Sequence, residues 1–274
     1  MIVAMILAAS HMLFDDFTYA TREQLTKHGW IVRGAAGWPG VPGAAWGGVE
    51  VGGGKIRMTA ATDGTPNGTR QAQLCHERKY LEGTYAARVR FSDAPAVDHV
   101  VQTFYLISPL REPMAPEYSE VDFEYLPQGG WGKTGPTLFA TTWETFSPEP
   151  QWKAVNTSDA ASRSYEGWHT LVVQIGSGAV RYFVDGTPLA KHGGDVYPES
   201  PMSINFNLWF IRNTLGTAGA SREYVEEIDW VYFSDALLAP ADVDTAVASL
   251  RRKLVAFRDT VPRKKPALES PCNF

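Results

Sequence analysis

Short segments that alternate hydrophobic and polar residues run through the chain from about residue 13 to residue 235. Five of them span 55–60, 83–91, 168–174, 179–184 and 227–233. Alternation with a period of two indicates half-buried strands, and glycine turns such as Gly176-Ser177-Gly178 indicate hairpins between them. We find no internal repeat, which argues against a propeller. The pattern therefore predicts an all-β sandwich of two antiparallel sheets, of the jelly-roll type.

Both ends of the chain depart from this pattern. Residues 1–12 hold a short apolar run without the basic residues that open a secretory signal, and we interpret them as a leader or an expression remnant. Residues 13–238 form the predicted main domain. After Pro240, apolar side chains recur at helical spacing from Val243 to Leu250, so residues 239–274 are expected to form a helix and an extended tail packed on that domain.

The most informative segment is Glu120-Val121-Asp122-Phe123-Glu124. In a strand, the three acidic side chains share one face and the two apolar side chains share the other. Carboxylates on one face repel each other, so the arrangement calls for an explanation. A solvated strand face and a Ca²⁺ or Mg²⁺ site are two explanations.

A third explanation is a carboxylate pair that cleaves glycosidic bonds, with one ionised nucleophile and one protonated acid. The neighbouring residues are aromatic and amide side chains, including Tyr118, Tyr125, Gln128 and Trp131. This setting suits a sugar better than a metal ion. The residue types and spacing are compatible with that chemistry but do not establish it.

Composition narrows the choice of partner. The chain has 274 residues, a net charge of −5 and no basic cluster, which disfavours nucleic acid. No stretch is apolar enough to span a membrane. The two cysteines exclude a disulfide scaffold; Cys75 and Cys272 either pair, if the tail folds back, or remain free thiols. We expect a monomer.

Several segments, in order along the chain, resemble glycoside hydrolase family 16. They are the acidic strand, Asp15-Asp16-Phe17, Gly83 to Val89, Gly167-Trp168-His169-Thr170, Phe183-Val184-Asp185-Gly186, Met202 to Trp209, and Ile228 to Tyr232. The resemblance implies a concanavalin A-like β-jelly roll with a concave cleft. It also favours secretion or attachment to the cell envelope, although the sequence itself leaves the location unknown.

The resemblance assigns roles to the acidic strand. Glu120 matches the catalytic nucleophile, Glu124 the general acid/base, and Asp122 the carboxylate that assists the pair. Asn207 and Trp209 match residues that contact sugar in the cleft.

The resemblance also makes Asp229 a candidate ligand of a structural calcium ion, and it implies that no other cofactor is required. We expect further substrate contacts, from tryptophans on or after the cleft strands and from polar residues at positions that the resemblance places in the cleft. The candidates are Trp131, Trp143, Thr142, Arg78 and His76.

The predicted function is that of a retaining, endo-acting β-glycosidase that hydrolyses a β-linked polysaccharide, by default a β-glucan. Two alternatives stay open: a transglycosylase with the same fold, and a carbohydrate-binding protein without catalysis. The loop from Leu126 to Trp131 departs from the family pattern. The strand from Thr137 to Trp143 also lacks an Asn that some members use to hold sugar. The sequence therefore leaves the exact sugar undefined.

Overall fold

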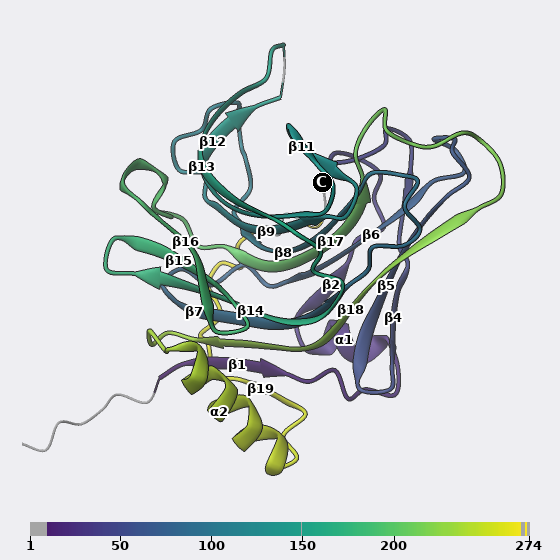
Figure 1. Cartoon of the computed structure of the whole chain (residues 1–274). Helices are drawn as coiled ribbons and strands as arrows, with labels where there is room; N and C mark the ends of the chain where they lie inside the picture. Colours follow the sequence, from purple (N-terminus) through teal and green to yellow (C-terminus); the bar gives the residue numbers. More distant parts are fainter. Residues whose placement is uncertain (1–9, 149, 270–271, 273–274) are drawn as a thin grey trace, which may run out of the picture.

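Two curved antiparallel sheets stacked face to face form the body of the protein (Figure 1), in a computed structural model that describes residues 10–148, 150–269 and 272. The concave sheet has, in spatial order, β2 (Trp30–Val32), β6 (Arg70–His76), β17 (Ser203–Phe210), β8 (Val100–Ile107), β9 (Glu120–Leu126), β12 (Thr137–Ser147) and β13 (Lys153–Ser162). This architecture confirms the predicted all-β jelly roll.

The convex sheet lies behind it. Its strands are β4 (Val49–Gly52), β5 (Lys55–Thr62), β18 (Arg222–Ser234), β7 (Gly83–Phe91), β14 (Gly167–Gly176), β15 (Ala179–Val184) and β16 (Thr187–Gly193). β1 (Met12–Asp15) pairs with the second half of β18 and with β19 (Phe257–Asp259). The remaining elements are short: α1 (Glu23–Lys27), β3 (Ala45–Trp46), β10 (Gly129–Gly130), β11 (Lys133–Thr134) and η1 (Gly194–Val196).

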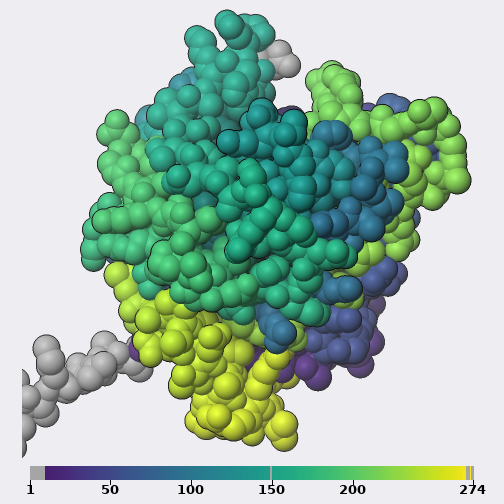
Figure 2. Space-filling model, in the orientation of Figure 1, coloured from purple at the N-terminus to yellow at the C-terminus, as the bar shows by residue number. Residues whose placement is uncertain are grey.

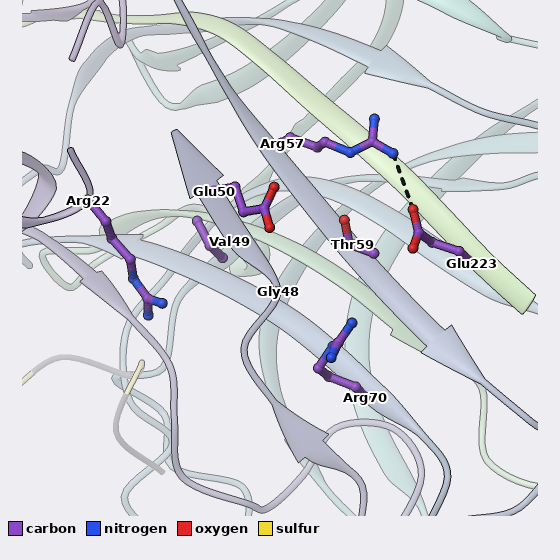
Figure 3. A pocket seen from close by; sticks show the side chains of 8 residues that line it. All are labelled: Arg22, Gly48, Val49, Glu50, Arg57, Thr59, Arg70 and Glu223. Atoms are coloured by element: carbon purple, nitrogen blue, oxygen red, sulfur yellow. Dashed lines mark hydrogen bonds and ion pairs between the residues drawn. The ribbon is translucent and has the colours of Figure 1, made fainter. Parts of the chain in front are cut away.

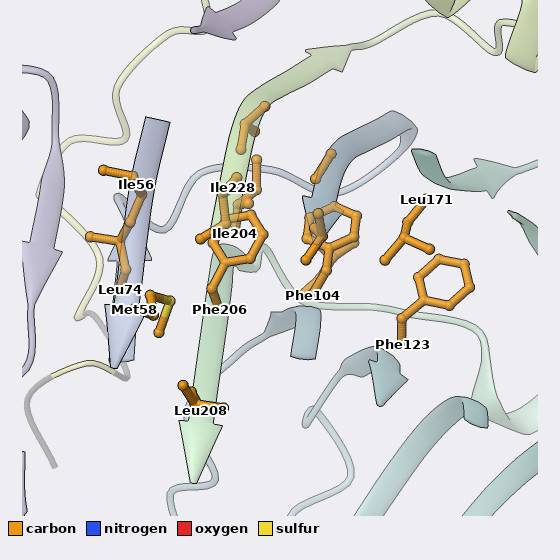
Figure 4. Packing of buried hydrophobic residues seen from close by; sticks show 14 of the residues in the cluster. Ile56, Met58, Leu74, Phe104, Phe123, Leu171, Ile204, Phe206, Leu208 and Ile228 are labelled. Atoms are coloured by element: carbon orange, nitrogen blue, oxygen red, sulfur yellow. The ribbon is translucent and has the colours of Figure 1, made fainter. Parts of the chain in front are cut away.

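The main core fills the space between the sheets (Figure 4). Phe104, Phe123 and Phe206 reach into it from the concave sheet, and Met58 and Ile228 reach into it from the convex sheet. All are at most 1% exposed. Burial of one such side chain contributes about 1.5–3 kcal/mol, so this layer fixes the phase of every strand. Because side chains alternate along a strand, the next residues of the concave sheet must face away from the core.

The helix α2 (Pro240–Arg252) covers the outer face of the convex sheet (Figure 1), and the yellow C-terminal atoms form the lower edge of the molecule in the space-filling view (Figure 2). Pro240 occupies the first turn, where a missing N–H costs no hydrogen bond. Val243, Val247 and Leu250 pack in a second core with Phe14 and Trp230. The predicted helix thus begins within the expected segment. Within the described residues, no helix is long and apolar enough to cross a membrane.

A disulfide between Cys75 on β6 and Cys272 joins the C-terminal tail to the concave sheet, with 5.8 Å between the Cα atoms. It settles the alternative left open by the sequence in favour of pairing. Lys79 reinforces the attachment, since its Nζ lies 2.5 Å from Asp259 Oδ2. Of the predicted leader, residues 1–12, the first nine lie outside the described residues.

Candidate active site

The strand β9 carries its three acidic residues on the concave face. Pairing with β8 and β12 is continuous along the strand, with Ile107 and Trp143 beside Glu120, and Thr103 and Phe139 beside Glu124. Val121 and Phe123 are buried in the main core. The core therefore sets the phase that directs Glu120, Asp122 and Glu124 away from it.

These carboxylates lie on the floor of a cleft of about 860 Å³. Aromatic side chains supply much of its lining: Trp38, Tyr105, Trp131, Phe139, Trp143, Phe146, Trp152 and Trp209. Trp38, Trp131 and Trp152 are about half exposed, at 58%, 47% and 54%. Flat apolar rings around a polar floor suit a ligand with apolar faces and many hydroxyl groups, such as a saccharide.

Neighbouring donors bind two of the three acids. The Tyr118 hydroxyl donates to Glu120 Oε2, and the Trp143 indole Nε1 donates to Asp122 Oδ2 at 2.6 Å. The other carboxylate oxygen of Asp122, Oδ1, is buried and has no hydrogen-bond partner among the described residues.

Burial raises the pKa of all three carboxyl groups, but not equally. Desolvation raises the pKa of Glu120 to about 7, and the hydrogen bond from Tyr118 offsets part of that rise. The pKa of Glu124 rises to about 8 through desolvation and the nearby charge of Glu120. Burial and the charges of Glu120 and Glu124 raise the pKa of Asp122 well above its usual range. The hydrogen bond from Tyr118 favours the ionised form of Glu120, and burial beside the charge of Glu120 favours the protonated form of Glu124.

Comparison with known proteins identifies the family. The model of glycosyl hydrolases family 16 matches residues 49–232. The chain belongs to glycoside hydrolase family 16. A search of curated protein sequences finds no match. The enzyme is thus a glycoside hydrolase, as its sequence predicts.

Solved structures of this family share the fold. The β-glucanase of Bacillus licheniformis superposes with a TM-score of 0.61 at 14% identity, covering 82% of this chain and 99% of that one. LamAcat from Zobellia galactanivorans superposes with a TM-score of 0.60 at 15% identity, covering 82% of this chain and 98% of that one. Porphyranase B from the same organism superposes with a TM-score of 0.61 at 15% identity, covering 81% of this chain and 90% of that one. At these identities the likeness concerns the concanavalin A-like fold.

Four of the residues predicted to contact substrate line the cleft of this hydrolase: Asn207, Trp209, Trp131 and Trp143. The Asn207 amide Nδ2 donates to the Tyr105 hydroxyl at 3.0 Å. Its Oδ1 is buried and has no partner among the described residues, so it is free to accept a hydrogen bond from a ligand. Trp131 follows the β10 strand with a φ of 49° and packs edge-on against Phe139.

Thr142 does not face the cleft. Its hydroxyl contacts Tyr182 at 2.6 Å and His192 at 2.8 Å on the opposite side of β12, and the side chain is fully buried. Thr141, one position earlier, lines the cleft and shares a hydrogen bond with Ser158 on β13. The alternation along β12 therefore places Thr141, rather than Thr142, in the cleft.

His76 and Arg78 also lie outside the cleft lining. His76 is fully buried, and its ring nitrogens contact the His28 carbonyl at 2.8 Å and the Tyr80 hydroxyl at 2.7 Å. It follows Gln71 and Gln73 at odd spacing, so it falls on the core face of β6. Arg78 lies beyond the end of β6 and donates to the Pro201 carbonyl at 2.6 Å. Both residues therefore stabilise the fold rather than contact the substrate.

Asp229 is held by arginine. Arg251 of α2 donates to both of its carboxylate oxygens, at 2.7 and 3.1 Å, and Arg88 lies 3.7 Å away. Two guanidinium groups neutralise this carboxylate, which does not fit a calcium ligand. Within the described residues, no cluster of His, Cys, Asp and Glu side chains is arranged to hold a metal ion. The structure assigns Asp229 instead to the attachment of α2.

Several residues of the cleft escaped sequence reasoning. They are Gln73, Tyr105 and Trp38. Gln73 and Tyr105 share the concave face with the acids, a placement that follows from strand pairing rather than from any local motif.

A smaller hollow of about 400 Å³ lies away from this site (Figure 3). Its lining is mostly charged, including Arg22, Glu50 and Arg70 and an ion pair of 3.2 Å between Arg57 and Glu223. No aromatic ring lines it. The aromatic cleft with its buried acids is therefore the better candidate for saccharide chemistry.

Proposed function

We propose that this hydrolase is a retaining, endo-acting glycosidase that cleaves a β-linked glucan by double displacement. The observation that supports the proposal is the placement of Glu120 and Glu124 on one face of β9, at the floor of the aromatic cleft. A retaining enzyme requires one ionised and one protonated carboxyl group. The hydrogen bond from Tyr118 favours the ionised form of Glu120, and burial favours the protonated form of Glu124.

In the first step, the Glu120 carboxylate attacks the anomeric carbon and the bond from that carbon to the leaving sugar oxygen breaks. Glu124 donates its proton to this oxygen, so the leaving sugar departs as an alcohol. The product is a glycosyl ester of Glu120. Asp122, held by the indole of Trp143, lies between the two glutamates on the same face of β9 and assists the pair.

In the second step, a water molecule attacks the anomeric carbon of the ester. Glu124, now ionised, accepts the proton of the water, and the bond to Glu120 breaks with its electron pair returning to the carboxylate. Two inversions at the same carbon give net retention. A sugar hydroxyl in place of the water would make the reaction a transglycosylation.

The aromatic lining supports cleavage within a polymer. Trp143 lies beside Glu120, and Phe139 lies beside Glu124. Aromatic rings thus flank the acids at both ends of the β9 face, so a chain can bind on either side of the scissile bond. Related structures include a β-1,3-1,4-glucanase from a mouse hindgut metagenome and a mixed-linkage glucan enzyme of Bacteroides ovatus with bound product. The β-glucans named for these two proteins support a β-glucan as the substrate here.

The test is turnover of β-1,3-glucan, mixed-linkage β-glucan, galactans and xyloglucan by the wild type and by Glu120→Ala. We expect a rapid fall in viscosity with the wild type only, and β-anomeric product seen first by NMR. Initial release of the α-anomer would exclude retention. Binding without turnover would favour a carbohydrate-binding protein, and products longer than the substrate would favour a transglycosylase.

We also infer that the enzyme works outside the reducing cytosol. The Cys75–Cys272 disulfide supports this location, because disulfides persist in oxidising compartments. Thiol labelling of the protein isolated from its native cells, without reductant, tests the inference. Two reactive thiols would contradict it.

A further inference from the structure

The loop between β2 and β3, residues 33–44, reaches from one edge of the concave sheet to the other. It leaves β2 at one edge, yet the ring centre of Trp38 lies 5.5 Å from that of Phe146 on β12. Four strands separate β2 from β12, so the two lie about 24 Å apart along the sheet at the usual strand spacing. The sheet is curved, with β12 and β13 on one side and β6 on the other (Figure 1), and this curvature brings the two rings together.

The contact between the two rings lies on the cleft side of the sheet. Trp38 and Gly40 line the cleft, whereas the other face of the sheet is filled by the main core. Phe146 packs against Tyr118, with 5.4 Å between the ring centres, and the Tyr118 hydroxyl donates to Glu120. The two rings therefore span the cleft at the Glu120 end of the acidic strand.

Contacts on both sides of Trp38 fix the backbone of the loop. Arg33, which is 1% exposed, donates to the carbonyl oxygens of Ala35 and Trp38 at 2.9 and 3.1 Å. On the other side, Val41 is buried in the main core, and its N–H donates to Gln71 Oε1 at 3.2 Å. The Trp38 side chain between these two anchors is 58% exposed. The span can therefore open by rotation of this side chain alone.

We propose that Trp38 is a specificity-determining residue that limits the cleft to unbranched glucan chains. The inference rests on the proposed cleavage of β-glucans and adds which glucans fit. A bound chain passes between the floor of the cleft and the strap, the pair of rings of Trp38 and Phe146. A sugar attached as a side branch collides with the strap, and a clash of this kind discriminates against the unwanted ligand.

The exposed position of Trp38 makes the strap compatible with cleavage inside a polymer. Exposed side chains change rotamer within picoseconds to nanoseconds, so an internal segment of a chain can enter from the side. The anchored backbone keeps the loop in place, and the ring then returns over the bound chain. A branch near the scissile bond prevents this return, whereas an unbranched segment does not.

The test compares unbranched β-1,3-glucan oligosaccharides with oligosaccharides of the same length that carry one β-1,6-linked glucose branch. We expect the wild type to favour the unbranched form in kcat/KM by about 10-fold or more, the discrimination that a steric misfit in a pocket can supply. In Trp38→Ala the ratio should fall to about twofold, mainly because the branched form is cleaved faster. Trp38→Phe retains a ring and should keep most of the discrimination.

Trp152→Ala is the matched control. Trp152 is 54% exposed and also packs on Phe146, with 5.6 Å between the ring centres, but it follows β12 and does not span the cleft. This variant should weaken binding of both oligosaccharides and leave their ratio unchanged. A wild type that cleaves both forms equally, or an unchanged ratio in a folded Trp38→Ala, would overturn the role of Trp38.

Binding to inactive variants separates this inference from the proposed function. Isothermal titration calorimetry would measure the affinity of both oligosaccharides for Glu120→Ala and for the double variant Glu120→Ala/Trp38→Ala. The strap predicts tighter binding of the unbranched form to the first variant and no preference in the second. If this result came with a wild type that turns over neither oligosaccharide, the strap would stand and the proposed function would be contradicted.

Discussion

At the scale of single residues, the partly buried glutamates Glu120 and Glu124 are expected to set the working pH. The active form has Glu120 ionised and Glu124 protonated. The pKa of Glu120 is about 7 and that of Glu124 about 8. Activity therefore rises through the first value and falls through the second, and we expect a bell-shaped kcat/KM profile with its maximum between pH 7 and 8. Initial rates on a soluble β-glucan from pH 5 to 10 would measure it; a maximum below pH 5 would contradict the assignment.

The same groups make folding depend on pH. Both glutamates have a folded pKa above their ordinary value of 4.5, so the folded state binds more protons than the unfolded chain. Their stabilising contribution is complete below about pH 4.5 and is lost as the pH rises to about 8. We expect Tm to fall between pH 5 and pH 8, and to fall less in Glu124→Gln. Calorimetry checks this, with the exposed Glu166→Gln as a control that retains the full decline.

Sequence reasoning at this scale succeeded where side-chain alternation was clear. The acids of β9 alternate with two core residues, so their common face could be predicted. Thr142 was misplaced because the adjacent residues Thr141 and Thr142 are identical and lie on opposite faces of β12, so residue type does not mark the cleft side. His76 belongs to a strand whose cleft-lining residue is the neutral Gln73, so no charge pattern marked its orientation.

At the scale of elements, the β12–β13 hairpin forms one wall of the cleft. Trp152 follows β12 and packs against Phe146 and Trp143, with ring centres 5.6 and 6.2 Å apart. Trp38, from the loop after β2, joins them through Phe146. The rings form a platform beside Glu120, which strand pairing assembles from segments far apart in sequence. No local motif could have predicted it.

Removal of one ring from this platform should weaken binding more than chemistry. Trp152→Ala loses a half-exposed ring that does not touch the acids. We expect KM for a long β-glucan to rise about 3- to 10-fold, because an aromatic contact contributes about 0.5–1.5 kcal/mol, while kcat changes less than twofold. Steady-state kinetics on the polymer and on a short aryl glycoside would separate the effects.

Trp168→Ala is the matched control for that substitution. Trp168 lies on the convex sheet near Arg88, outside the cleft lining. This variant should leave KM unchanged. An equal rise of KM in both variants would indicate a general loss of structure. It would contradict a role of the aromatic platform in substrate binding.

At the scale of the whole molecule, the ordered strands made the jelly roll predictable, because the period-two pattern and the hydrophobic core specify the same faces. The way in which the C-terminal segment attaches to the main domain was harder to predict from the sequence. Helical spacing predicted α2, yet the ion pair of Arg251 with Asp229 depends on how the helix crosses the sheet. Two isolated cysteines likewise cannot reveal whether the tail returns to β6.

The disulfide should be a large contributor to stability. It joins residues 197 positions apart, and a chain-entropy estimate for a loop of that length is about 5 kcal/mol. We expect Cys75→Ser to lower Tm by roughly 10 °C or more. Cys75 does not line the cleft, so kcat/KM at 25 °C should stay within about twofold of the wild type. Calorimetry with and without reductant checks this: reductant should lower Tm of the wild type and leave that of Cys75→Ser unchanged. If the two proteins melted together under oxidising conditions, the tail would be held by its other contacts, among them Lys79 with Asp259 and β19 with β1.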